Sequence, residues 1–140
     1  MRLNISKQFE FQMAHALSDY EGKCRNLHGH NYRLRVTVTA TIEDNLPEKG
    51  MILDFSQIKE IVNGRIVSLF DHALVVRNDS PFRDIEGTKL VVVPFNPTTE
   101  NLLLHFSRLL HDAFPAGTQL HSLRLYETND SFAELLVAEN

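Results

Sequence analysis

The chain has 140 residues, of which 43% are apolar and 23% charged, and its formal net charge is −4. This length predicts one domain over residues 1–140 with an ordinary core. The acidic balance argues against a nucleic-acid-binding surface, which needs a basic face. No apolar stretch approaches the roughly 18–20 residues of a membrane span, and the N-terminus lacks the apolar segment of a signal peptide. Because the sole cysteine, Cys24, excludes an intrachain disulfide, we expect a cytoplasmic protein.

Two segments with strand-like alternation open the chain. Apolar side chains fall on odd positions over residues 3–15 and on even positions over residues 30–43. Alternation with a period of two places side chains of one parity on one face of a sheet. His15, His28 and His30 share the apolar parity of these segments and stand at their ends. If the two strands pair, the three imidazoles converge.

Such a group of imidazoles predicts a metal site. Residues i and i+2 of a strand lie about 6.6–7 Å apart, so both rings can reach one ion through bonds of about 2 Å. Three protein ligands and one open position are typical of catalytic zinc sites. We therefore predict that His15, His28 and His30 hold one Zn²⁺ per subunit, although the ligand type also suits iron, nickel or copper. The alternative is three unrelated polar residues near strand ends.

A loop over residues 43–50 and a short strand over residues 51–53 are expected next. Asp54 is a predicted helix N-cap, because Gln57 three residues later completes a capping-box pattern. The apolar stripe of this helix has helical spacing. It consists of Ile58, Ile61, Val62, Ile66 and Leu69.

A short buried strand over residues 90–93 should end at Pro94. Thr98 and Thr99 are expected to cap a second helix that runs to about Ala113. The segments 121–127 and 132–137 then predict a final pair of strands. The resulting order β-β-α-α-β-β indicates an α+β fold with an antiparallel sheet.

Six short motifs, in chain order, resemble those of the 6-pyruvoyl-tetrahydropterin synthase family, whose bacterial branch includes 6-carboxy-tetrahydropterin synthase. They are Ala14-His15, Cys24-x3-His28-Gly29-His30, Asp54-Phe55, Asp71-His72, Pro97-Thr98-Thr99-Glu100-Asn101 and Glu127-Thr128. The resemblance spans nearly the whole chain. The interval of four residues from Cys24 to His28 is similar to the carboxy branch, because the pyruvoyl branch usually has a longer one.

The resemblance implies the tunnelling fold (T-fold), a four-stranded antiparallel sheet with two helices on one face. In this fold three subunits close a β-barrel, two trimers often stack as a hexamer, and active sites form across subunit boundaries. We therefore expect a homo-oligomer, either a trimer or a dimer of trimers. Closure of a barrel by neighbouring subunits would also remove open sheet edges.

The activity implied by the resemblance is conversion of 7,8-dihydroneopterin triphosphate to 6-carboxy-5,6,7,8-tetrahydropterin, acetaldehyde and triphosphate, on the route to queuosine and other 7-deazapurines. Two alternatives remain. One is the pyruvoyl branch, in which triphosphate is eliminated and the three-carbon side chain stays. The other is a zinc- and pterin-binding module without turnover.

The resemblance also assigns catalytic roles. Cys24 is the expected base or nucleophile, and the adjacent Lys23 and Arg25 favour its thiolate form. His72, with Asp71, is expected to relay protons. The alternatives are a buried structural cysteine and a histidine that interacts with a helix C-terminus.

Glu127 has the parity of apolar neighbours on its strand, so its carboxylate needs a partner. The resemblance implies that it accepts hydrogen bonds from the amino group and ring N–H of the pterin, and that Thr98 and Thr99 also touch the substrate. The alternative for Glu127 is a buried ion pair with an arginine. Asp54 is expected to be a cap only. Weak candidates for binding the triphosphate are Lys23, Arg25, Arg33, Arg35 and Arg77, and no chemistry is assigned to His105, His111 and His121.

Overall fold

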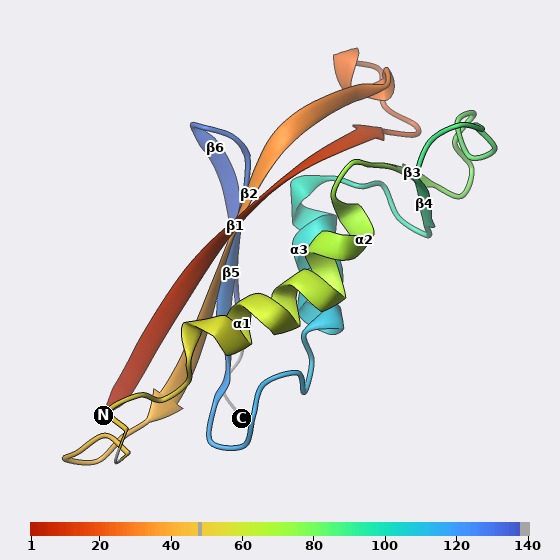
Figure 1. The fold of residues 1–140 in the computed structure, drawn as a ribbon. Coiled ribbons are helices and arrows are strands. Elements are labelled where there is room, and N and C mark those ends of the chain that lie inside the picture. The colour runs from red at the N-terminus through yellow and green to blue at the C-terminus, as the bar shows by residue number, and fades with distance from the viewer. Residues whose placement is uncertain (48, 138–140) are drawn as a thin grey trace.

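In the computed structural model, which describes residues 1–47 and 49–137, a long curled sheet carries helices on one face (Figure 1). The sheet has six strands in the order β4-β3-β1-β2-β5-β6. These strands are β1 (Arg2–Ala16), β2 (His28–Thr41), β3 (Ala73–Arg77), β4 (Leu90–Val93), β5 (Gln119–Thr128) and β6 (Ser131–Leu136).

The strands β1, β2, β5 and β6 form the predicted antiparallel four-stranded sheet. The short strands β3 and β4 extend it at the β1 edge, and both run parallel to their neighbours. The strand predicted over residues 90–93 is confirmed as β4, although only Val93 of its four residues is buried. The predicted element order is wrong because it omits both β3 and β4, which lie between the two helical regions. Residues 73–76 of β3 are all buried. Burial on both faces removes the alternation that marks a strand in a sequence.

The first helical region runs without a break from Phe55 to Phe70. It comprises α1 (Phe55–Val62), a π-helical segment (Asn63–Val67) and α2 (Ser68–Phe70). The predicted capping box is confirmed, because Asp54 Oδ1 accepts from Ser56 N at 2.8 Å and Asp54 N donates to Gln57 Oε1 at 3.2 Å.

The predicted apolar stripe of this region holds as far as Ile66, which is fully buried, but Leu69 is 48% exposed. The wider i→i+5 turn of the π-helical segment rotates the residues that follow it relative to α1. Phe70, instead of Leu69, therefore enters the core.

The second helix, α3 (Thr99–Leu109), ends four residues before the predicted Ala113. Its N-cap is Thr98, whose hydroxyl accepts from Asn101 N at 3.2 Å. The chain leaves the helix at Leu110 and reaches a positive φ of 54° at Asp112, which ends the helical hydrogen bonding.

The short strand predicted over residues 51–53 is absent, and these residues form a bend before α1. Leu53 is buried and Ile52 packs against the core. The apolar character of this segment therefore comes from anchoring the entry to α1 and not from pairing in the sheet.

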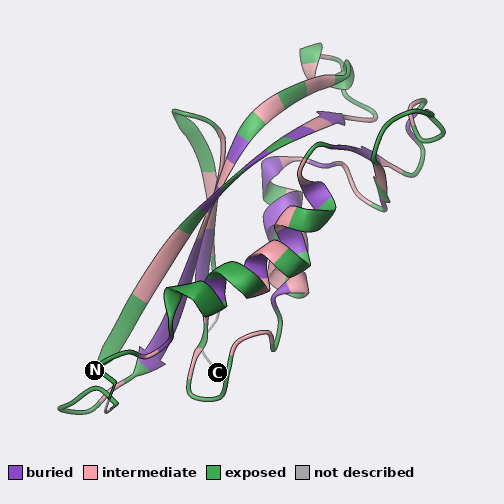
Figure 2. Cartoon of the chain, viewed as in Figure 1, coloured by how far each residue is buried: buried purple, intermediate pink, exposed green. Residues whose placement is uncertain are grey.

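The core lies between the helices and one face of the sheet, as the buried residues in Figure 2 show. The odd positions Phe9, Phe11 and Met13 of β1 and the even positions Tyr32, Leu34 and Val36 of β2 are all buried. The predicted parity of both strands is therefore confirmed. None of the helices in the described part of the chain is long and apolar enough to cross a membrane.

Candidate metal centre and active site

Pairing of β1 with β2 brings the three histidines together. His15 lies directly opposite His28, and Met13 lies opposite His30. The ring centroids are 4.5 Å apart for His15 and His28, 5.2 Å for His15 and His30, and 5.0 Å for His28 and His30. One ligand nitrogen from each ring lies within 4.8 Å of the other two. The predicted convergence is confirmed, and this group could hold a metal ion.

Backbone carbonyls fix the orientation of two of these rings. His15 Nδ1 lies 2.8 Å from Pro97 O, and His28 Nδ1 lies 2.6 Å from Asn26 O. A carbonyl oxygen only accepts, so each Nδ1 carries a proton, and in a neutral ring the lone pair is then on Nε2. These two Nε2 atoms are 3.0 Å apart. Two facing lone pairs at this distance fit a shared cation, and a backbone carbonyl on the other ring nitrogen is typical of metal-bound histidine.

The third ring supplies a further nitrogen near the other two. His30 Nε2 is buried and has no hydrogen-bond partner among the described residues, and Glu127 Oε1 lies 3.4 Å from it. Burial lowers the pKa of both His15 and His30 below the ordinary value. The neutral imidazole is the form that binds a metal, so the donor set fits a divalent cation such as Zn²⁺.

Glu127 lies beside the histidine group near the end of β5, and 28% of its side chain is exposed. Thr99 Oγ1 donates to Glu127 Oε2 at 2.9 Å. The carboxylate is thus held by the hydroxyl of Thr99 and lies near His30. It is not held by an arginine of the described residues, as the alternative interpretation would require. Thr98 caps α3 as predicted, but Thr99 does not cap, because its hydroxyl is directed to Glu127.

Cys24 lies on a short 3₁₀ helix, Lys23–Arg25, in the loop between β1 and β2, and is half-buried. Its carbonyl accepts from Leu17 N at 2.9 Å. Burial raises the pKa of Tyr32, and the nearby Glu127 and Cys24 raise it further. Tyr32 Oη in turn lies 3.4 Å from His15 Nδ1.

Asp71 and His72 form a contacting pair in the turn between α2 and β3. His72 Nδ1 is 2.9 Å from Asp71 Oδ1, which also accepts from Gln12 N at 3.0 Å. This hydrogen bond from Gln12 is the main cause that lowers the pKa of Asp71. His72 has a φ of 61°, and 73% of its side chain is exposed. The pair is therefore anchored through Asp71, while the imidazole is open to solvent.

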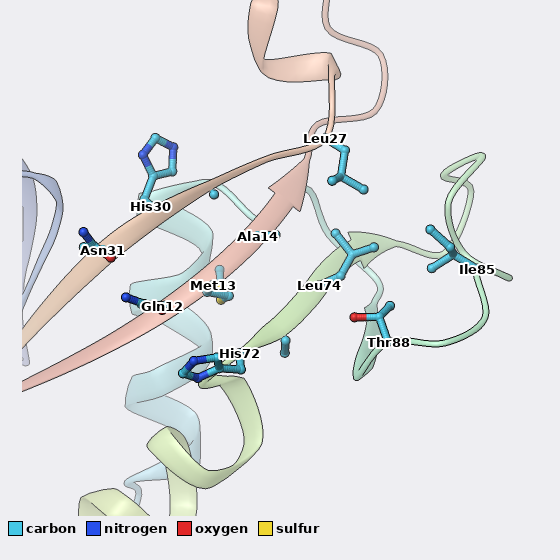
Figure 3. Close-up of a pocket in the computed structure, with 12 residues that line it drawn as sticks. Gln12, Met13, Ala14, Leu27, His30, Asn31, His72, Leu74, Ile85 and Thr88 are labelled. Atoms are coloured by element: carbon cyan, nitrogen blue, oxygen red, sulfur yellow. The ribbon is translucent and has the colours of Figure 1, made fainter.

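His72 and His30 both line a cavity of about 640 Å³. Gln12 and Asn31 also line it, and their positions in β1 and β2 have the parity of the face opposite the core. In Figure 3 the ring of His30 points away from His72. The structure thus brings together His15, His28, His30 and Glu127, while His72 lies beside strand positions that face away from the core.

Two of the candidate triphosphate ligands are engaged within the chain. Arg77 is 2.6 Å from Asp19 and 2.7 Å from Asp79, and the hydrogen bonds that Arg77 donates to Asp79 lower the pKa of Asp79 to about 2. Arg33 stacks over the ring of Tyr126 at 4.2 Å. The most important groups that the sequence did not reveal are the carbonyls of Pro97 and Asn26, because backbone acceptors have no residue-type signal.

The sheet, the helices on one face and the three-histidine site define an α+β protein of the tunnelling-fold class. The sequence profile described as 6-pyruvoyl tetrahydropterin synthase matches residues 4–137. The chain belongs to this family.

Curated relatives cover nearly its whole length. It is 38% identical over 138 residues to a 6-carboxy-5,6,7,8-tetrahydropterin synthase of Haemophilus influenzae, covering 93% of this chain and 96% of the relative. It is 35% identical over 130 residues to the protein of the same name from Synechocystis, covering 92% and 89%.

Solved structures agree in fold. An uncharacterized protein from Wolinella succinogenes superposes with a TM-score of 0.81 at 21% identity, covering 97% of this chain and 98% of the other. The 6-pyruvoyl tetrahydropterin synthase of Caenorhabditis elegans superposes with a TM-score of 0.72 at 21% identity, covering 99% and 97%. At this level of identity, the structures support the fold alone.

Proposed function

We propose that the protein is a 6-carboxy-5,6,7,8-tetrahydropterin synthase, a lyase that converts 7,8-dihydroneopterin triphosphate and one water to 6-carboxytetrahydropterin, acetaldehyde and triphosphate. The observation that carries this proposal is the convergence of three imidazoles beside Glu127. The names of the relatives in Haemophilus influenzae and Synechocystis support the carboxy product over the pyruvoyl product.

In this proposal His15, His28 and His30 hold one Zn²⁺ ion per subunit. Bound there, the ion supplies Lewis-acid stabilisation of the negative charge that develops on the substrate side chain. Glu127 lies 3.4 Å from His30 of this group. The pterin would therefore be bound with its reacting side chain next to the imidazoles.

The remaining groups bind the ring and move protons. Glu127, held by the hydroxyl of Thr99, accepts hydrogen bonds from the amino group and ring N–H of the pterin, a pair of donors that matches a carboxylate. Cys24 moves a proton at the first carbon of the side chain. Thr98 shapes the wall beside Glu127 by fixing the start of α3. Reduction of the ring occurs by internal redox tautomerisation, so the reaction needs no nicotinamide.

We assign the Asp71–His72 pair to a site that a neighbouring subunit completes. Within one chain the ring of His30 points away from His72 (Figure 3), whereas a relay must lie within hydrogen-bond reach of the reacting atoms. Assembly as a trimer or a dimer of trimers, with the sheets closed into a barrel, would supply that contact and cover the edge strands β4 and β6. We place this enzyme in the cytoplasm, on the route to queuosine and other 7-deazapurines.

The test is direct. Purified protein loaded with zinc is incubated with 7,8-dihydroneopterin triphosphate, and acetaldehyde and the pterin product are quantified together. We expect one acetaldehyde per substrate consumed, and loss of turnover with retained zinc in Cys24→Ala. Formation of a stable 6-pyruvoyl product without acetaldehyde would move the protein to the pyruvoyl branch. Binding of zinc and pterin without any product would identify a binding module.

A further inference from the structure

The four residues that lead into α3 contact separate parts of the candidate site. The carbonyl of Pro97 orients the ring of His15, and the hydroxyl of Thr99 holds the carboxylate of Glu127. Thr98 between them caps the helix, which fixes the backbone of both neighbours. This segment therefore sets the relative positions of one metal-ligand candidate and of the proposed pterin-binding carboxylate.

Asn96, which begins this segment, contacts the loop that carries Cys24. Its Oδ1 accepts from Ser18 N at 2.7 Å, and its Nδ2 donates to Ser18 O at 2.8 Å. Both polar atoms of the carboxamide are thus used on the backbone of one residue, 78 positions earlier in the chain. The Asn96 backbone is itself fixed, because its carbonyl accepts from Thr98 N at 2.8 Å and from Asn101 Nδ2 at 3.0 Å.

The hydrogen bonds continue from Ser18 to Cys24. Leu17, next to Ser18, donates its N–H to the carbonyl of Cys24 at 2.9 Å. Asp19, on the other side of Ser18, is 2.6 Å from Arg77 at the end of β3. Residues 17–19 therefore form the fixed edge of the loop, and the backbone of Cys24 is attached to this edge.

We propose that Asn96 is a positioning residue for Cys24. Its paired hydrogen bonds to Ser18 hold residues 17–19 against the entry to α3, and through Leu17 they fix the place of the Cys24 thiol relative to His15 and Glu127. An error of about 1 Å in the place of a reacting group can cost about 100-fold in rate. The consequence for turnover rests on the proposed function, whereas the effect on the thiol does not.

The experiment uses the fact that the chain has a single cysteine. Alkylation of the zinc-loaded protein by iodoacetamide therefore reports on Cys24 alone. Asn96→Asp keeps the shape and the acceptor for Ser18 N but replaces the donor to Ser18 O with a second acceptor. Asn96→Ala removes both hydrogen bonds. Asn45→Asp makes the same chemical change in an exposed part of the loop before α1 and is the matched control.

We expect Cys24 in both Asn96 variants to be alkylated about threefold or more faster than in the parent, because the loop opens locally. We also expect kcat to fall about tenfold and KM to change less than about twofold, since the pterin contacts are untouched. Bound zinc should stay at the parental ratio, and Asn45→Asp should match the parent in every measurement.

If Asn96→Asp has the parental rate of alkylation and the parental kcat, the proposal is overturned. If its thermal midpoint is lowered while both values stay parental, Asn96 has a structural role only. Because Asn96→Asp is isosteric, it provides this decision even if Asn96→Ala does not fold. If alkylation is accelerated but the parent forms no product, the positioning of Cys24 stands and the proposed function fails.

Discussion

The histidine group and the Asp71–His72 pair are both predicted to handle the reaction, yet their surroundings differ. His15 is buried, and backbone carbonyls fix both His15 and His28. By contrast, 73% of the His72 side chain is exposed, and Asp71 is its partner. The fold of a single chain therefore fixes the side chains of the metal candidate. In the relay candidate it fixes Asp71 but leaves the imidazole of His72 exposed.

This difference shows which part of the chemistry a single chain can support. A preorganised group needs its partners in place before substrate arrives, and the histidine group satisfies this condition within the chain. The imidazole of His72 contacts Asp71 but is otherwise largely exposed to solvent. We interpret the pair as a group prepared for a neighbouring subunit, so the two regions should respond differently to mutation and to mixing of subunits.

The largest effect is expected from removing a predicted metal ligand. His28→Ala deletes one of the three nitrogens, so bound zinc should fall from about one to below about 0.1 per chain after dialysis, and turnover should fall at least about 1,000-fold. Elemental analysis and acetaldehyde formation measure the two effects. His111→Ala is the control, because His111 is an exposed histidine that contacts Asp112. Full zinc content in His28→Ala would contradict the assignment of this ligand.

The next effect tests the relay. His72→Asn should lower kcat about 100-fold with zinc retained, and asparagine tolerates the positive φ at this position. If Cys24 and His72 of one site come from two subunits, an equal mixture of refolded Cys24→Ala and His72→Asn chains should recover about a quarter of the parental activity, because a quarter of the sites are then intact. Absence of recovery in assembled mixtures would place both groups in one chain.

A smaller effect is expected at the pterin end of the site. Thr99→Val removes the hydrogen bond to Glu127 while keeping the shape, so the carboxylate loses its fixed orientation. Since a hydrogen bond to a charged group contributes about 1.5–3 kcal/mol, we expect KM to rise about tenfold with kcat within about threefold. Thr118→Val, which removes a hydroxyl that donates to Pro115 O, should leave both constants unchanged. An unchanged KM in Thr99→Val would show that Thr99 does not position Glu127 for substrate.

The smallest effect concerns pH and the anchor of the pair. The hydrogen bond from Gln12 N lowers the pKa of Asp71. The stability that this hydrogen bond contributes is therefore present above the pKa of Asp71 in the unfolded chain, about 3.9. It is lost as the pH falls through the lower pKa that Asp71 has in the folded protein. In metal-free protein, the thermal midpoint should therefore decrease less between pH 5 and pH 3 in Asp71→Asn than in the parent. We expect the two decreases to differ by about 1–2 °C. Asp112→Asn is the control, because that side chain is 87% exposed. Identical acid profiles for Asp71→Asn and the parent would contradict the anchoring role.

Strand parity and capping were readable from the sequence because each depends on neighbouring residue types. The odd positions of β1 and the even positions of β2 predicted which face is buried, and hence that His15, His28 and His30 meet. The capping box at Asp54 and the cap at Thr98 were equally local. These features define the histidine group almost completely.

The rest depends on contacts between segments far apart in the chain. Strand β3 is buried on both faces, so it carries no alternation, and the acceptors at Pro97 and Asn26 are backbone atoms. The bond from Gln12 N to Asp71 joins residues 59 positions apart. Placement of His72 on the far face of the sheet follows from such pairing and from no single motif.

The widened turn at Asn63–Val67 determines the direction around the helix axis in which each following side chain points. One residue corresponds to about 100° around an α-helix axis, so a regular α-helix over the same residues, without the widened turn, would swing Phe70 out of the core. Asp71 would then lose its place beside Gln12, and the neighbouring imidazole would aim elsewhere. A single additional residue in a helix thus determines where a side chain on the opposite surface of the molecule points.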